Sequence, residues 1–237
     1  MRIIPTLLIN KRALVKTVGF RHEEYLGDPI NAIRLFNDYE AHELIILDID
    51  CNEPDIQFLT QLASKSRMPL AYGGGISSLK QAMDVIRLGF DKIVLNTLLF
   101  KDHMEVARII KALGSQSVIG CVEISRNNKG QYLLRQDLSK NIDEFLDDLT
   151  SAGVGEIFLY DTDREGKRTG LEIVDFERLC LKTNVPIIIG GGLASYEELA
   201  GIQSEVFDAV AVGSLFVYYG KRNAVLINYD IKKYGLY

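Results

Sequence analysis

The sequence predicts a single-domain α/β protein, a closed parallel (β/α)8 TIM barrel built from two half-barrel repeats. Three observations predict this fold. The chain repeats itself at about half its length, short apolar runs alternate with helix-like segments, and 237 residues suit one such barrel. An open, doubly wound sheet is the alternative, but that fold has no need of two similar halves of four strands each.

The main repeat relates residues 68–100 to residues 185–217 without a gap, at an offset of 117 residues (185 − 68). The glycine triplet at 73–75 matches the triplet at 190–192, and the distance from each triplet to the next apolar run is the same. Chance is a poor explanation for an ungapped match of this length, so the two halves are interpreted as duplicated copies.

A second match relates Glu43–Asp50 to Glu156–Asp163, at an offset of 113 residues (156 − 43). Both offsets are close to half of the chain. The sequence therefore predicts half-barrels over residues 1–115 and 116–237 of one domain.

Strands and helices are expected to alternate along each half. The β-rich runs lie near residues 2–8, 43–48, 69–73, 92–96, 117–123, 156–161, 186–190 and 208–213. The helix-period segments lie near residues 30–41, 55–66, 78–89, 104–113, 141–152, 172–183 and 195–204. Asp28 before Pro29 is a typical helix start, and Ser78 and Ser195 are expected helix N-caps after the glycine loops.

The composition indicates an ordinary globular protein, with 47% hydrophobic residues and a net charge of −5. This charge argues against nucleic-acid binding. The cysteines and histidines are too scattered for a disulfide framework or a metal site, so we expect reduced thiols, no metal and no cofactor; they are Cys51, Cys121, Cys180, His22, His42 and His103. No apolar run approaches ~18 residues and no signal region is found, so a cytoplasmic protein without membrane association is expected.

Two anion cradles are predicted where strands end, because reacting groups in such barrels lie at the carboxyl ends of strands. Glycines there let backbone N–H groups approach an anion closely. The first anion cradle is Gly74, Gly75, Asn96 and Thr97, and the second is Gly191, Gly192, Gly213 and Ser214. A short helix from Ser214 to Tyr219 would aim its N-terminus at the ligand. Two cradles suggest a ligand with a phosphate at each end; the alternative is that the glycines only make tight turns.

Glu123 is the candidate general acid or base, because strand five lies opposite strand one across the mouth of the barrel, its carboxyl-terminal end. The alternative is a carboxylate that caps a loop or pairs with Arg126. Lys16, in the apolar run "ALVKTV", either reaches over the mouth to an anionic or carbonyl oxygen or is a solvated surface lysine. Further acids follow strands two and six: Asp48, Asp50, Asp161, Asp163 and Glu165.

A charged ring is expected at the bottom, the amino-terminal end of the barrel, where strand starts converge. Its members are Arg2, Glu43, Lys92 and Glu156, at the starts of strands one, two, four and six. One interpretation is a set of ion pairs that adds little stability. The other is a gate for a small polar molecule that enters from below.

The motifs "RIIP", "GDP", "HELIILDI", "GGGI", "DKIVLNT", "GSQ" and "DAVAVGSLF" occur in an order that resembles the cyclase subunit of imidazole glycerol phosphate synthase. The resemblance covers residues 2 to about 220. It implies a half-barrel-repeat protein that takes ammonia from a partner glutaminase, docked on the bottom face, and uses it on a substrate with two phosphates. It further implies that the charged ring is an ammonia gate, and that the substrate pocket includes Asp48, Tyr160, Asp163 and Glu165.

The chain departs from that family at the reacting groups. The family uses two aspartates, which end strands one and five, and the matching positions here are Leu8 and Glu123. Leucine cannot transfer a proton, and the loss of one general acid/base group costs ~10²–10⁴-fold in rate. Tyr160 matches a family threonine, and its larger side chain alters the pocket.

The segments "IIPTLL" and "GSLFVYYGKRNAVLINY" resemble a branch of the family associated with amidino-sugar formation on bacterial surface polysaccharides. In that branch the barrel and a glutaminase supply ammonia to a separate sugar amidotransferase. We therefore expect a barrel subunit of a glutamine amidotransferase complex that serves nucleotide-sugar amidation. The alternatives are a cyclase of histidine biosynthesis, a non-catalytic activator of a glutaminase, and a related sugar-phosphate isomerase.

Overall fold

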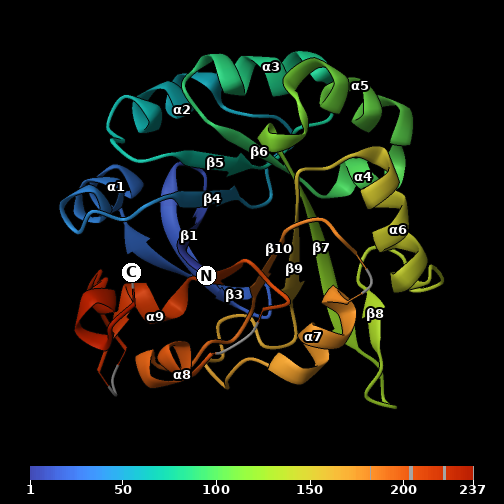
Figure 1. The fold of residues 1–237 in the computed structure, drawn as a ribbon. Helices are drawn as coiled ribbons and strands as arrows, with labels where there is room; N and C mark the ends of the chain where they lie inside the picture. The colour runs from blue at the N-terminus through green and yellow to red at the C-terminus, as the bar shows by residue number, and fades with distance from the viewer. Residues whose placement is uncertain (182, 203–204, 221–222, 237) are drawn as a thin grey trace.

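Eight parallel strands form a closed ring with helices around it in the computed structural model (Figure 1). The structure describes residues 1–181, 183–202, 205–220 and 223–236. The barrel strands are β1 (Arg2–Asn10), β4 (Leu44–Asp48), β5 (Leu70–Gly73), β6 (Lys92–Leu95), β7 (Val118–Arg126), β9 (Glu156–Asp161), β10 (Ile187–Gly190) and β11 (Ala209–Val212). Parallel pairing of β11 with β1 closes the ring, so the predicted barrel is confirmed.

The expected helices are present, most of them a few residues shorter than expected. They are α1 (Pro29–Asp38), α2 (Ile56–Ala63), α3 (Leu79–Arg87), α5 (His103–Leu113), α6 (Ile142–Ala152), α7 (Ile173–Cys180) and α8 (Tyr196–Gly201). The side chains of Asp28, Ser78 and Ser195 cap α1, α3 and α8 as expected. Residue 182 and residues 203–204, at the ends of two expected helices, lie outside the described residues. In the described part of the chain, no helix is long and apolar enough to cross a membrane.

Several elements were not expected from the sequence. A hairpin follows β1 and consists of β2 (Ala13–Val18) and β3 (Arg21–Gly27), and β8 (Tyr132–Leu134) pairs with the end of β7. The short helices α4 (Thr97–Lys101), η1 (Ser115–Ser117) and η2 (Asp230–Tyr234) were also not expected, whereas α9 (Ser214–Val217) was. The helix expected over 214–219 ends at Val217, because Tyr218–Tyr219 forms β12, which pairs with β13 (Ala224–Val225).

Side chains inside the barrel form layers, because alternate residues of a strand point to the same face. Ile4, Ile45, Val94 and Phe158 each lie two residues beyond a member of the charged ring and belong to one buried interior cluster. Above the ring the interior is therefore apolar. On β1 the same face continues through Thr6 to Leu8, so these two side chains belong to the upper layers and the mouth.

Equivalent residues of the two halves make equivalent bonds. The Asp91 carboxylate accepts a hydrogen bond from the Leu70 N–H at 3.0 Å, and the Asp208 carboxylate accepts one from the Ile187 N–H at 2.9 Å. These positions are related by the 117-residue offset. The internal repeat of the sequence therefore reappears as matched hydrogen bonds at equivalent positions of the barrel.

The C-terminal segment covers the place between the last and first strands. The Tyr229 ring packs edge-on against Phe36 of α1 and Phe216 of α9, and its hydroxyl donates to the Ile3 carbonyl at 3.2 Å. The C-terminal segment, which includes the short helix η2, therefore packs against α1, α9 and β1.

Candidate functional site

The charged ring at the bottom of the barrel is a closed circle of ion pairs. Arg2 pairs with Glu43 at 3.0 Å and with Glu156 at 2.7 Å, and Lys92 pairs with Glu43 at 3.8 Å and closely with Glu156. Burial alone would raise the pKa of Glu156, but hydrogen bonds and charge from Arg2 and Lys92 hold it below its usual value. The structure therefore brings together the four residues that the sequence grouped.

The second anion cradle opens into a pocket at the mouth. Gly191, Gly192, Gly213 and Ser214 line it together. Gly191 has φ +111°, and a side chain there would strike the Asp161 carbonyl, so only glycine fits this turn. The predicted members of this cradle are thus adjacent in space.

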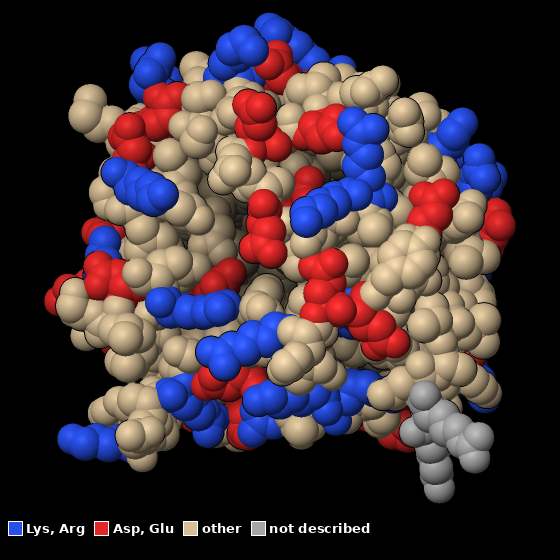
Figure 2. All heavy atoms as spheres, turned by 180° about the vertical axis from the view of Figure 1, so that it is seen from behind, with Lys and Arg blue, Asp and Glu red and all other residues tan. Residues whose placement is uncertain are grey.

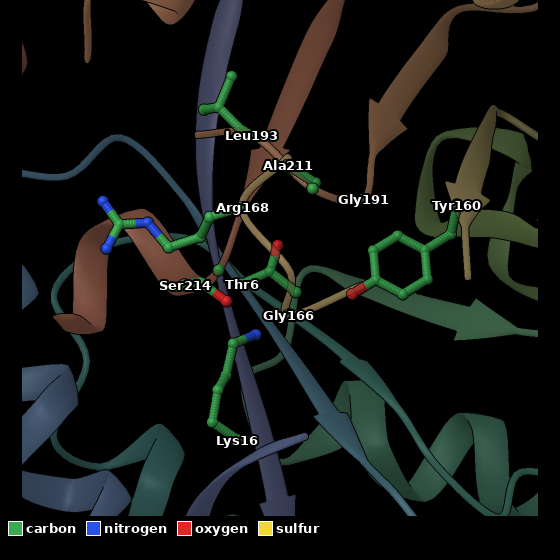
Figure 3. Close-up of a pocket in the computed structure, with 11 residues that line it drawn as sticks. Thr6, Lys16, Tyr160, Gly166, Arg168, Gly191, Leu193, Ala211 and Ser214 are labelled. Carbon is green, nitrogen blue, oxygen red and sulfur yellow. The ribbon is translucent and has the colours of Figure 1, made fainter. Parts of the chain in front are cut away.

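Other elements add polar groups to the same pocket. In Figure 3 the hydroxyl of Tyr160 and the amine of Lys16 point toward the space beside Thr6 and Ser214. The alternation of β1 side chains contained a signal for Thr6, which the sequence reasoning missed. The pocket also includes Arg168, whose guanidinium donates to the Ala194 carbonyl at 3.2 Å. An amine and three hydroxyls around backbone N–H groups can bind a phosphate.

Lys16 is buried rather than solvated, because only 6% of its surface is exposed. Its amine lies 3.7 Å from a carboxylate oxygen of Glu165, which is fully buried. Burial lowers the pKa of Lys16, although the charge of Glu165 opposes that shift. Of the two interpretations left open by the sequence, the surface lysine is therefore wrong.

Glu165 holds the β2–β3 hairpin against the loop after β9. Its other carboxylate oxygen accepts a hydrogen bond from the Thr17 hydroxyl at 3.0 Å and one from the Phe20 N–H at 3.1 Å. The Gly19 N–H donates to the Glu165 carbonyl at 3.0 Å. Glu165 was predicted to lie in the substrate pocket; its carboxylate instead touches the hairpin that carries Lys16.

The first anion cradle is more crowded. A side chain at Gly75 would lie 2.5 Å from the Glu53 nitrogen, so this glycine allows the loop after β4 to pack closely. The Asn96 amide donates to Glu123 at 2.8 Å and accepts from the Gln136 amide at 2.6 Å. Asn96 is therefore engaged by neighbouring side chains, while Thr97 begins α4.

Glu123 lies on β7 and pairs with Arg135, not with Arg126. The Arg135 guanidinium donates to the Glu123 carboxylate at 3.3 Å, whereas Arg126 forms a close ion pair with Asp175. Burial raises the pKa of Glu123, and Arg135 and Asn96 limit that rise. On the opposite strand, β1, the matching position is Leu8, which is 1% exposed.

The remaining predicted pocket residues do not lie together in one pocket. Asp48, the last residue of β4, accepts a hydrogen bond from the Tyr72 hydroxyl at 3.2 Å, and burial raises the pKa of Asp48 to about 6. Asp163 accepts a hydrogen bond from the Arg126 N–H at 2.6 Å and so joins the end of β7 to the loop after β9. Tyr160 alone of these lines the pocket of the second cradle.

The face turned away in Figure 1 has a central hollow, with acidic and basic side chains close together around it (Figure 2).

Comparison with known proteins identifies relatives over nearly the whole chain. The family model described as "Histidine biosynthesis protein" matches residues 2–223. A protein of Pseudomonas aeruginosa, with the provisional name imidazole glycerol phosphate synthase subunit hisF2, is 40% identical over 98% of this chain and 97% of its own length. A provisionally named hisF3 subunit of Vibrio vulnificus is 36% identical over 96% of this chain and 92% of its own length.

A Helicobacter hepaticus protein named imidazole glycerol phosphate synthase subunit HisF is 32% identical over 92% of this chain and 90% of its own length. The predicted family is thus confirmed by matches that span the barrel. The chain therefore belongs to the histidine biosynthesis protein family, as a HisF-like homologue of the subunits of imidazole glycerol phosphate synthase.

Proposed function

We propose that this chain is the barrel subunit of a glutamine amidotransferase complex. It receives ammonia from a partner glutaminase docked on the bottom face and delivers it for amidation in nucleotide-sugar and surface polysaccharide biosynthesis. One observation carries the proposal, the contrast between the two ends of β1. Arg2 at the bottom belongs to a closed charged ring, whereas Leu8 at the mouth replaces a proton-transferring group with an apolar side chain.

The interior supports passage of a small molecule from the ring toward the mouth. Above Arg2 and Glu156 the interior layer is apolar, and it contains the small side chains of Ala71, Ala209 and Ala211. Neutral ammonia loses less on entering such a layer than ammonium does, because burial disfavours the charged form. The ring thus stands where ammonium would release a proton to the solvent and enter as neutral ammonia.

The names of the relatives support a partner, since they are called subunits of a synthase. Relatives with provisional names share 30–40% identity with this chain, and relatives simply named HisF subunits share 29–32%. The assignment to sugar amidation, and to a sugar amidotransferase as the acceptor enzyme, rests on the resemblance of "IIPTLL" and the C-terminal segment.

A cyclase of histidine biosynthesis is the second candidate. The observation that favours it is Glu123, a partly buried carboxylate with a raised pKa at the mouth, beside a pocket able to hold phosphate. Leu8 weighs against it, since a reaction that needs two proton-transfer groups would lose one of them. A non-catalytic activator of the glutaminase is the third candidate.

Hydrogen exchange on the complex tests where the glutaminase docks. The chain is purified with its cognate glutaminase, and amide exchange is compared with that of the free barrel. We expect protection of loops that precede strands at the bottom, residues 39–43, 64–69 and 88–91. Protection confined to loops at the mouth, such as residues 127–131, would contradict the proposed docking face.

A further inference from the structure

Arg135 lies at the mouth, directly after β8, and nothing in the sequence grouped it with the site. Its backbone N–H donates to the Glu123 carbonyl at 2.9 Å, which fixes the start of its side chain beside β7. Its guanidinium then turns back and donates to the Glu123 carboxylate at 3.3 Å. Two contacts with one residue place Arg135 as the immediate partner of the candidate acid.

The same guanidinium contacts the tip of the β2–β3 hairpin. The Cζ atom of Arg135 lies 4.8 Å from the centre of the Phe20 ring. Phe20 in turn packs edge-on against Tyr160, with ring centres 5.8 Å apart. The hairpin starts from β1, yet its tip touches Tyr160 on β9 and Arg135 after β8. It therefore crosses the mouth to the side of Glu123.

We propose that Arg135 is a positioning residue that holds the Glu123 carboxylate in an ion pair while the hairpin lies across the mouth. Phe20 supports the guanidinium on one side, and Glu123 receives it on the other. Movement of the hairpin removes the aromatic support and frees Arg135 to leave Glu123. Hairpin position and the charge state of Glu123 are then coupled through one side chain.

The groups that face Glu123 come from three elements and from its own strand. Arg135 follows β8, Asn96 follows β6, Tyr160 is the neighbour on β9, and Cys121 lies on β7 itself. Among these, Arg135 is the one cation. Burial raises the pKa of Glu123, and the Arg135 charge is the largest influence that lowers it.

Titration of Glu123 by carbon-13 NMR tests the proposal on the full chain, with the resonance assigned by its loss in Glu123→Gln. Arg135→Gln is expected to raise the midpoint by about 1 pH unit, because an opposite charge at this range lowers a carboxyl pKa by roughly 1–3 units. Arg135→Lys keeps a positive charge near Glu123, so its midpoint is expected to lie between those of the wild type and Arg135→Gln. Phe20→Leu raises the midpoint by a smaller amount, since the guanidinium loses its aromatic support.

Arg126→Gln is the matched control. Arg126 also lies near β8 and stacks on an aromatic ring, that of Tyr132, but it pairs with Asp175 instead of Glu123. It is expected to leave the Glu123 midpoint in place. An unchanged midpoint in Arg135→Gln, or an equal shift in Arg126→Gln, overturns the role of Arg135.

An unchanged midpoint in Phe20→Leu overturns the coupling to the hairpin and leaves the ion pair standing. Circular dichroism of each variant checks that the barrel is folded; the Arg135 side chain is 42% exposed, so its replacement removes little buried surface. The proposal concerns Glu123 in the free barrel. Its failure is therefore distinguishable from failure of the docking experiment, which uses the wild-type chain with its glutaminase.

Discussion

At the scale of single residues, three carboxylates near the mouth differ because their surroundings differ. Glu165 is fully buried against Lys16 and the hairpin, and Glu123 is paired with Arg135. Asp48 has no cation among its hydrogen-bond partners in the described part of the chain. Burial raises the pKa of Asp48 to about 6, although the Tyr72 hydroxyl opposes the shift. Ionisation of a buried carboxyl group of this kind lowers the free energy of unfolding, because burial disfavours the charged form.

Asp48→Asn is expected to stabilise the protein above pH 6. The folded state keeps a proton on Asp48 that the unfolded chain loses above pH 3.8, so wild-type stability falls as pH rises between these values. The asparagine variant lacks that loss. The full shift corresponds to about 3 kcal/mol, and the partial exposure of Asp48 reduces it, so we expect a gain of about 2 kcal/mol at pH 7.5 and little difference at pH 3.5. Urea unfolding at both pH values measures it; an equal effect at both would show that Asp48 is not the group that titrates.

Gly191→Ala is expected to lower the free energy of unfolding by about 3 kcal/mol or more. The strain of a positive φ and the clash with the Asp161 carbonyl both contribute to this loss. Gly130→Ala is the control: its φ is +77°, but nothing lies within 4 Å of an added Cβ. That variant should cost only about 1 kcal/mol. Equal losses in thermal unfolding would mean that the clash with the Asp161 carbonyl is relieved by movement of the loop.

At this scale the sequence predicted the cradle glycines from the repeated glycine triplets. It predicted the charged ring from the first residues of the strands, which meet at the bottom of the barrel. It did not predict Arg135, Phe20 or Gln136. These side chains reach the mouth from a hairpin tip and from a loop, and no spacing in the sequence indicates which strand end such a loop approaches.

At the scale of elements, the β2–β3 hairpin is the main structure missed by sequence reasoning. Its second strand reads "RHEEYLG", and its first five residues are exposed, so no apolar alternation indicates a strand. The hairpin gains its order from tertiary contacts, above all those of Glu165 with Thr17, Gly19 and Phe20.

Glu165→Gln is expected to loosen this hairpin while the barrel stays folded. Glutamine keeps an oxygen for the Thr17 hydroxyl but leaves the buried Lys16 amine without a charge partner, which costs about 3 kcal/mol. Amide exchange should rise over residues 17–25 and remain low in the barrel strands. Glu172→Gln, at the start of α7, is a control that removes an acid away from the hairpin; equal exchange of residues 17–25 in both variants would refute the assigned contact.

At the scale of the whole molecule, the barrel has two ends with different chemistry on one scaffold. The internal repeat made the fold predictable, because residues 68–100 recur at residues 185–217 and Glu43–Asp50 recurs at Glu156–Asp163. The Glu156 carboxylate, with its lowered pKa, stabilises the folded state above about pH 4.5, and this contribution is lost as pH falls further. Glu156→Gln should therefore unfold with a weaker dependence on pH below 4.5, measured by thermal unfolding between pH 3 and 6.

The most direct test of the central claim is a product measurement on the complete complex. The barrel, its cognate glutaminase, glutamine and the bisphosphate substrate of imidazole glycerol phosphate synthase are combined, and both glutamate and imidazole product are quantified. Ammonia handling without cyclisation predicts glutamate release with imidazole product reduced by at least ~10²-fold, in line with the loss of one proton-transfer group. Imidazole product formed in step with glutamate would contradict it.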